Sequence, residues 1–448
     1  MKALSLLVLL TIAAASSAAT ATAEREARAL FTQFKHEFNR HYASEAEEDR
    51  RFRVFQDTLA RIERRNRAER ASGHPHAAVH GVTQFADHTR EEFRRKLNSG
   101  GHHAPLVAVA EEEEAGKPFP VPYVPTPPVN CSKNWVADAP AGAYPVRNQD
   151  KCGGCWSYAT VEAIRGAFIA QGNDDPGMLS AEFLLDCAAP AWTAQNCSCG
   201  DWGTTKTCYD GCCGGNPPVA ANWIEAVGGL PTAVAYGGRG RYDENVTADI
   251  ARSAGDPFKK WPCDMSVPKA VKPTGAPQFF TGDGVINMTV ALLREVAAAK
   301  AKGGRAAEIA LLCKDYGVLC PVKGTDPPQF LSPEPVLAAH VCARGPVTIG
   351  VAAAWDTYVS GVMTTGACSN ETQGHSVVAV GVDAEKQAWI VRNSWGGDFG
   401  VAPTPPYAPA ARTPGGTGGG YILLAYGEDT CRMAELAFGQ PRLERAAA

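Results

Sequence analysis

The chain has 448 residues and a net charge of −4, with 43 Lys and Arg residues against 47 Asp and Glu residues. This length allows two or three domains with buried cores. No long basic tract points to nucleic acid, and no segment beyond residue 23 is long and apolar enough to span a bilayer. We therefore expect neither a nucleic-acid partner nor a membrane anchor.

Residues 1–23 have the pattern of a secretory signal peptide. Met1-Lys2 precede an apolar run, Leu4–Ile12, and small residues lead up to Ala23. We expect cleavage before Glu24 and a product in the secretory pathway, either in a lysosome-like compartment or outside the cell. Asn-x-Ser/Thr sequons compatible with glycosylation on that route occur at Asn130, Asn196, Asn245, Asn287 and Asn370.

All 15 cysteines lie beyond residue 130. In a secreted chain this distribution indicates a disulfide-linked domain that follows a segment of different construction. An odd number of cysteines leaves at least one thiol unpaired, and such a thiol is a candidate reactive group.

Residues 24–97 are rich in charge and have helical periodicity. Between residues 45 and 70, apolar side chains recur at three- and four-residue spacings, at Phe52, Phe55, Leu59 and Ile62, with Val54 on the flank. This pattern predicts an amphipathic helix of roughly 25 residues. By itself such a helix would equally suit a coiled-coil arm or a partner-binding surface.

The next segment, 98–130, combines glycines, an acidic run at Glu111–Glu114 and several prolines. This composition predicts an exposed linker that is open to proteolysis, and we place a processing site between about residues 115 and 130.

Beyond residue 131, helical patterns come first and strand patterns afterwards. Helices are predicted at 155–170, 180–187, 217–227 and about 290–302. From Pro333 onward the pattern is that of β-strands, at 346–351, 376–382, 388–391 and 421–424. The stretch 231–332 is otherwise hard to interpret, and residues 401–419 form a Pro/Gly/Ala insert without periodicity. This order favours an α+β domain of two packed parts with a cleft between them.

Two cysteines, Cys152 and Cys155, stand at the start of the helix predicted at 155–170. A helix N-terminus offers unpaired N–H groups and the positive end of the macrodipole, which favour a thiolate at Cys155. Cys155 is therefore a candidate nucleophile. The Cys-x-x-Cys spacing is also compatible with half of a zinc site or with a redox pair.

A thiol nucleophile needs a base, a group that orients the base, and donors for an oxyanion. His375 begins one predicted strand and Asn393 follows the end of the next, so adjacent antiparallel strands could bring their side chains together. The Gln-x5-Cys-Trp element from Gln149, the His before a β-run and the Asn-Ser-Trp-Gly sequence from Asn393 resemble the papain-like cysteine peptidases.

The N-terminal helix carries a second part of this resemblance. Glu47, Arg51, Phe55, Ile62 and Asn66 fit the ERFNIN-type pattern of cathepsin L-like proregions, with Thr58 in place of Asn. Gly81-x-Thr83-x-Phe85-x-Asp87 resembles the companion motif, again with Thr in place of Asn. Two further departures are Gly154, where Ser or Ala is usual, and the 375 − 155 = 220 residues between nucleophile and base, against about 130–150 in the family pattern. A surface insertion within 231–332 would account for the excess.

The resemblance implies a papain-like two-part fold, with a helical left part around a central helix and a β-barrel-like right part. The active-site cleft would lie between them, and a helical prodomain would precede them. We expect a signal peptide at 1–23, an inhibitory propeptide at 24–97, a linker at 98–130, and a peptidase domain at 131–448 with inserts at about 285–332 and 401–419.

The resemblance also implies a role for each candidate residue. Cys155 would attack the scissile carbonyl, and His375 would pair with it and later protonate the leaving amine. Asn393 would hold the imidazole, and Trp395 would shield that hydrogen bond from water. Gln149 and the backbone N–H of Cys155 would form the oxyanion hole.

The implied disulfides are Cys152–Cys212, Cys187–Cys263 and Cys368–Cys431. Eight further cysteines could form four more bridges whose pairing the sequence does not assign: Cys131, Cys197, Cys199, Cys208, Cys213, Cys313, Cys320 and Cys342. Zinc is conceivable for the cluster from Cys197 to Cys213, but disulfides are favoured in a secreted chain. We expect no metal and no cofactor.

For the substrate, Gly214-Gly215 resembles a backbone ledge for an extended peptide. The pocket for the side chain two residues before the scissile bond would be lined by Asn216, Pro217, Gly350, Ser376 and Leu436. Because none of these is charged, Leu, Phe or Val should be preferred there over Arg.

We expect a monomeric endopeptidase that acts on proteins or peptides, is inhibited by its own propeptide and is activated by acid. The competing hypothesis is a catalytically silent binding or storage protein of the same fold.

Overall fold

The computed structural model describes residues 22–97, 123–138, 146–149, 152–188, 211–237, 263–326, 328–368, 374–410, 419–440 and 442–446. Residues 1–21 of the expected signal peptide and most of the expected linker lie outside these ranges. So do Cys197, Cys199, Cys208, the sequons at Asn196, Asn245 and Asn370, and most of the second half of the 401–419 insert. No helix in the described ranges has both the length and the apolar character needed to cross a membrane.

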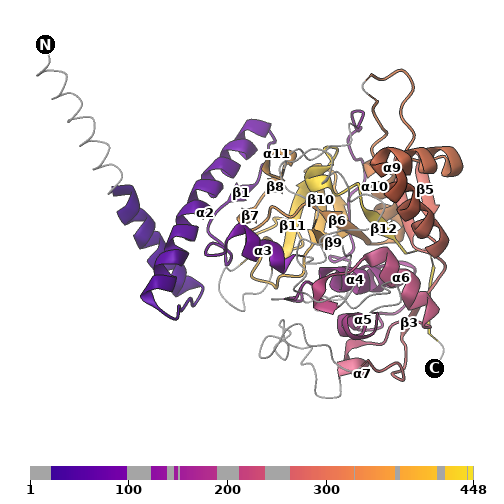
Figure 1. Cartoon of the computed structure of the whole chain (residues 1–448), viewed down its shortest axis with the longest axis horizontal. Helices are drawn as coiled ribbons and strands as arrows, with labels where there is room; N and C mark the ends of the chain where they lie inside the picture. Colours follow the sequence, from indigo (N-terminus) through magenta and orange to yellow (C-terminus); the bar gives the residue numbers. More distant parts are fainter. Residues whose placement is uncertain are drawn as a thin grey trace, which may run out of the picture.

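The N-terminal segment, residues 22–97, is helical around an aromatic cluster. Residues 22–37 form a helix, followed by α2 (Glu45–Ser72), β1 (Val79–His80) and α3 (Arg90–Lys96). Helix α2 begins where Ser44 Oγ accepts the Glu47 N–H, and it ends at Gly73, whose φ is 72°. Phe52 and Phe55 pack on Phe31 and Phe34 of the first helix. The predicted amphipathic helix is confirmed, and it lies along one side of the β-rich part (Figure 1).

The left part is built around α4 (Cys155–Ala170), in which every residue from Cys155 to Phe168 is buried. Around it lie α5 (Ala181–Cys187), η1 (Gly211–Cys213), α6 (Pro217–Ala226) and α7 (Ala233–Gly237). Ser180 is the N-cap of α5, as expected, and its hydroxyl accepts the Phe183 N–H at 3.1 Å. The three helices predicted in this region are confirmed.

The right part is one sheet with the order β5-β4-β12-β6-β9-β10-β11-β8, and β2 pairs with β9. Its strands are β2 (Lys133–Asn134), β4 (Gln278–Thr281), β5 (Gly284–Asn287), β6 (Val347–Val351), β8 (Val362–Met363), β9 (His375–Asp383), β10 (Ala388–Arg392), β11 (Tyr421–Ala425) and β12 (Ala437–Gly439). All four predicted strands are present. Among the described residues the end strands β5 and β8 do not pair, so the sheet of the right part, expected to be barrel-like, is open.

Two short ribbons lie outside this sheet. Strand β1 pairs with β7 (Tyr358–Ser360), and β3 (Val271–Thr274) pairs with β13 (Arg442–Arg445). The short helical turns α11 (Thr365–Cys368) and η2 (Thr430–Arg432) are joined by the Cys368–Cys431 disulfide.

Two elements differ from the sequence expectation. Residues 334–344, expected to belong to the β-rich pattern, form helix α10 (Glu334–Arg344), since prolines at its start are tolerated in the first turn. Helix α9 (Val290–Tyr316) is longer than the 290–302 expected. Gly303 and Gly304 leave helical geometry there, so two helical pieces meet at a kink.

The left and right parts each have their own buried core. A segment near the start of the expected peptidase domain packs on the right part, and the C-terminal segment packs on the left part. Strand β2, near the start of the expected peptidase domain, pairs with β9 of the right part. At the other end, Leu443 of β13 is buried in the core of the left part, and its N–H donates to Gln171 Oε1 at 3.0 Å. Figure 1 shows the C-terminus beside β3.

Candidate active site

Cys155 is the first residue of the central helix α4 and is fully buried. It is the one cysteine without a disulfide among those described. The backbone N–H of Ser376 donates to its Sγ at 3.4 Å, so the start of β9 touches the sulfur. Cys152, three residues earlier, is bonded to Cys212. The zinc and redox interpretations of the Cys-x-x-Cys motif are therefore wrong.

His375 and Asn393 come together at the ends of adjacent antiparallel strands. Strands β9 and β10 pair antiparallel, with a register shift between Ile390 and Val391, and His375 Nε2 lies 2.8 Å from Asn393 Oδ1. Because an amide oxygen only accepts, this contact assigns the Nε2 proton to His375. The ring of Trp395 stacks on that of His375, with centroids 4.8 Å apart, and is fully buried.

Gln149 is buried beside the same residues and is fixed by two contacts. Its Nε2 donates to the Cys152 carbonyl at 2.9 Å, and Ser394 Oγ donates to its Oε1 at 2.6 Å. The residues expected at the catalytic centre thus lie in one place.

The thiol of Cys155 lies in a covered environment. Burial raises the pKa of Cys155 to about 12, while the backbone N–H groups of Ser376, Trp156 and Cys155 itself act in the opposite direction. Desolvation favours the neutral thiol, and hydrogen-bond donors favour the anion. In this state the first effect prevails.

A buried ion cluster links the three segments that carry these residues. Glu162, two helical turns after Cys155, accepts from Arg147 at 2.7 Å and lies 3.6 Å from Arg392, which directly precedes Asn393. Burial would raise the pKa of Glu162, but the guanidinium groups of Arg392, Arg147 and Arg165 outweigh it and hold that pKa at about 2. No sequence motif marks this cluster, because its members are far apart in the chain.

A pocket beside the sulfur contains all five residues expected to bind the substrate side chain. It is lined by Asn216, Pro217, Thr348, Gly350, Ser376, Leu436 and Phe438. Thr348 and Phe438 were not foreseen, since they lie in no motif and reach the pocket only through strand register. Both polar atoms of the buried Asn216 side chain lack a hydrogen-bond partner among the residues that the structure describes.

The Gly214-Gly215 pair has a structural requirement of its own. Gly214 has a φ of 119°, which disfavours any side chain. A Cβ on Gly215 would lie 2.3 Å from the indole of Trp156, so the backbone packs directly on the ring next to Cys155. The expected role of these glycines as a ledge for the substrate remains a prediction.

The N-terminal segment covers this centre. Phe85 and Phe93 meet the Trp395 ring edge-on at 5.3 and 5.4 Å. Leu97 reaches Gly374, since a Cβ there would lie 4.0 Å from Leu97 Cδ1. Strand β1 pairs with β7, which extends the contact between the N-terminal segment and the right part.

Helix α2 adds a buried ion pair to that contact. Arg61 Nε lies 3.0 Å and Arg65 Nη1 2.5 Å from the two carboxylate oxygens of Asp356. Further along α2, the carboxylate of Glu69 accepts the hydroxyl of Thr364 at 2.9 Å. All these side chains are buried.

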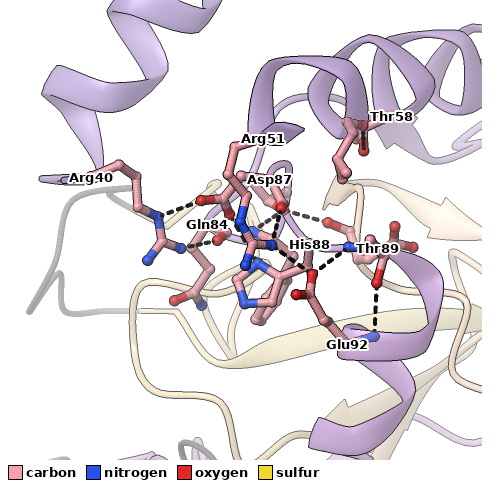
Figure 2. A network of polar contacts seen from close by, with 12 residues as sticks. Arg40, Arg51, Thr58, Gln84, Asp87, His88, Thr89 and Glu92 are labelled. Carbon is pink, nitrogen blue, oxygen red and sulfur yellow. Dashed lines mark hydrogen bonds and ion pairs between the residues drawn. The ribbon is translucent and has the colours of Figure 1, made fainter. Parts of the chain in front are cut away.

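The two N-terminal motifs meet in a polar network (Figure 2). Arg51 of α2 donates to the Asp87 carbonyl at 2.9 Å and to Glu92 at 2.6 Å, and Arg40 lies 3.5 Å from the Asp87 carboxylate. Thr58, which replaces the expected Asn, accepts from Arg61 and donates to the Val54 carbonyl, both at 3.0 Å. The substitution therefore keeps a buried hydrogen-bonding group.

Comparison with known proteins identifies both segments. A model described as "Papain family cysteine protease" matches residues 130–272 and 323–404. The chain belongs to the papain family of cysteine proteases. A second model, "Cathepsin propeptide inhibitor domain (I29)", matches residues 31–93, so this papain-family protease is made with a propeptide.

Individual relatives agree with this assignment. The chain is 29% identical over 384 residues to "Probable cysteine protease RD19C" of Arabidopsis thaliana, which covers 83% of this chain and 77% of that relative. It is 25% identical to "Cysteine proteinase 1" of Dictyostelium discoideum, with 91% of each chain covered. A digestive procathepsin L2 proteinase from Tenebrio molitor larval midgut has the same fold, with a TM-score of 0.53, 20% identity, and coverage of 93% and 100%.

The disulfides of this papain-family chain include the three implied by the resemblance, Cys152–Cys212, Cys187–Cys263 and Cys368–Cys431. Two more, Cys131–Cys342 and Cys313–Cys320, pair four of the eight cysteines that the sequence left unassigned. The side chains of Cys197, Cys199, Cys208 and Cys213 lie outside the description. Within the described part of the chain, no cluster of three or more His, Cys, Asp or Glu side chains could hold a metal ion.

Proposed function

We propose that this papain-family protease is an endopeptidase that is made as an inactive proenzyme and hydrolyses peptide bonds through a thiolate and an acyl-enzyme intermediate. The observation that carries the proposal is the meeting of Cys155, the His375–Asn393 pair and Trp395 beneath a covering N-terminal segment. This arrangement has the parts of a Cys-His-Asn triad.

In the proposed reaction, His375 takes the proton from Cys155, and the resulting thiolate attacks the scissile carbonyl carbon. The carbonyl oxygen becomes an oxyanion, to which the Gln149 amide and the Cys155 N–H donate. When the C–N bond breaks, His375 gives the proton to the leaving amine and a thioester remains on Cys155. Water, deprotonated by His375, then attacks the thioester and releases the acid together with the free thiol.

Asn393 and Trp395 act through His375. The hydrogen bond from Nε2 to Asn393 Oδ1 sets the ring orientation and the tautomer, which leaves Nδ1 to exchange the proton with sulfur. Stacking by Trp395 keeps water from this bond. Both are positioning residues.

The substrate would lie along Gly214-Gly215 and place the side chain two residues before the scissile bond (P2) in the pocket between Asn216 and Leu436. The pocket carries no charge among its lining residues, so burying Arg there would leave a cation without a partner. We expect a hydrophobic P2 residue. Faster cleavage after Arg-Arg than after Phe-Arg in dipeptidyl fluorogenic substrates would contradict this.

Activation would follow acidification in the secretory pathway, in a lysosome-like compartment or outside the cell. Residues 1–23 would direct the chain there, and cleavage between about residues 115 and 130 would release residues 24–97. Until then the propeptide keeps the nucleophile buried. N-terminal sequencing of the secreted and the active forms would locate both cleavage sites.

The decisive experiment is alkylation of the acid-processed protein with iodoacetamide. We expect one label per chain, at Cys155, with a proportional loss of peptide hydrolysis, and no hydrolysis by Cys155→Ser. A folded, processed chain whose Cys155 neither labels nor supports hydrolysis would instead be a silent member of the family.

A further inference from the structure

Residues 284–320, here called the insert, comprise β5, α9 and the loop closed by Cys313–Cys320. The papain-family model does not match them, since its matched segments end at 272 and resume at 323. The insert is nevertheless not a surface appendage. Met288, Leu292, Leu293, Val296 and Leu312 are all buried, at 3% exposure or less.

The insert packs against the wall of the pocket that comes from the right part. Leu436 and Phe438 line the pocket, and they also belong to the same buried cluster as the apolar side chains of α9. Strand β12, which follows Leu436, pairs with β4, the strand next to β5. The rings of Phe438 and Phe279 are 5.4 Å apart, which ties the pocket wall to that cluster.

The insert also holds the wall that comes from the left part. Asn216 and Pro217 line the pocket at the start of α6. Further along α6, Asn222 Nδ2 donates to the Met288 carbonyl at 3.0 Å, and Val219 packs on the insert cluster. The insert thus contacts both walls behind the pocket, one from each part.

We propose that the insert is a specificity element that fixes the width and depth of the P2 pocket by bracing α6 and β12 from behind. This inference rests on the proposed peptidase function. Leu436 lines the pocket and belongs to the buried cluster of the insert, and its carbonyl accepts the Gly350 N–H at 2.7 Å. Because the braced walls cannot move apart, the pocket should accept Leu at P2 more readily than the larger Phe. Leu292 and Asn222 are the positioning residues that this model singles out.

The test compares processed, active-site-titrated enzymes on two peptides that differ only in Leu or Phe at P2, with the ratio of the two kcat/KM values as the readout. Leu292→Ala opens a cavity in the cluster that also contains Leu436 and Phe438, and we expect the ratio to shift about fivefold toward Phe. Asn222→Ala removes the hydrogen bond from α6 to Met288, and it should shift the ratio about twofold in the same direction. The matched control is Leu230→Ala, a fully buried leucine in the left core, which should leave the ratio unchanged.

An unchanged ratio in both Leu292→Ala and Asn222→Ala would overturn the inference. An equal shift in the Leu230→Ala control would overturn it as well, because general loosening would then suffice. If Leu292→Ala does not fold, Asn222→Ala decides. A wild-type enzyme that cleaves neither peptide would refute the peptidase function, and the inference with it, whereas active enzymes with a constant ratio refute only the inference.

Discussion

At the scale of single residues, the covered thiol gives the proenzyme a distinctive chemical behaviour. A thiol whose pKa is raised stays protonated as pH increases, so Cys155 in the proenzyme, at about 12, holds very little thiolate at neutral pH. Once the propeptide leaves, solvent and a protonated His375 should lower that pKa into the range of about 3.5–7.5 known for activated cysteines.

We therefore predict different pH profiles for alkylation of the two forms. Labelling of Cys155 in the proenzyme should accelerate about tenfold per pH unit between pH 7 and 10, whereas the processed enzyme should already label at a constant rate there. The measurement is the iodoacetamide rate against pH, with Cys155→Ser as the blank. A plateau above pH 7 in the proenzyme would contradict the prediction.

The residues of the site differ in how far the sequence could predict them. Cys155, Gln149, His375 and Asn393 lie in short motifs, and so do the glycines beside Trp156. Thr348, Phe438 and Asp356 could not be found in this way. Their role comes from strand register or from contact with a distant helix, and such pairings leave no local pattern.

At the scale of elements, the contact between α2 and the residues around Asp356 depends on charge. Burial would raise the pKa of Asp356, but Arg65 and Arg61 outweigh it and keep that pKa below its usual value. A carboxyl group with a lowered pKa stabilises the contact above its unfolded pKa of about 4. That stabilisation is lost as pH falls through the lowered value. Burial would also raise the pKa of Asp87, but His88, Arg40 and Tyr42 outweigh it and lower that pKa. Protonation of Asp87 in acid should therefore also destabilise the propeptide itself.

Asp356→Asn should activate at a higher pH than the wild type. The amide keeps the shape but leaves two buried guanidinium groups without a counter-ion, and breaking such a pair typically costs about 3–5 kcal/mol. We expect the midpoint of activation to rise by about one pH unit. The measurement is the appearance of peptidase activity after incubation at graded pH.

The matched control for that variant is Asp315→Asn, an exposed carboxylate on α9. Asp315→Asn should activate at the same pH as the wild type. After processing, Asp356→Asn and Asp315→Asn should have the same peptidase activity at pH 5.5. Identical activation profiles for Asp356→Asn and the wild type would show that the ion pair does not hold the propeptide.

Elements with a strong period were predictable, and those with mixed signals were not. Helix α2 and α4 each show one uninterrupted apolar pattern. In α10, Pro335 and the β-branched Val336 and Val341 masked a short helix, which forms because it packs on the sheet. In α9 the Gly303-Gly304 pair resembled a helix end although the chain resumes its helical path after it.

At the scale of the whole molecule, the Cys131–Cys342 disulfide joins residues 211 apart, and Cys313–Cys320 joins residues 7 apart. Longer loops restrict the unfolded chain more. Cys131→Ser/Cys342→Ser should lower the free energy of unfolding by about 5 kcal/mol, and Cys313→Ser/Cys320→Ser by about 2.5 kcal/mol. Urea unfolding of proenzymes that also carry Cys155→Ala, to prevent self-cleavage, measures both. Equal losses would argue against a loop-entropy origin.

The placement of β2 and β13, each packed on the part of the domain farther from it in sequence, affects resistance to proteolysis. Strand β2 precedes the left part in the sequence, but it pairs with β9 in the sheet of the right part. Strand β13 follows the last strand of that sheet, but its Leu443 is buried in the core of the left part. Neither part can open without pulling out a strand that the other part holds. Partial opening is the route by which folded chains become cleavable. A protease surrounded by active copies of itself is therefore protected from self-digestion by the way its own ends are exchanged.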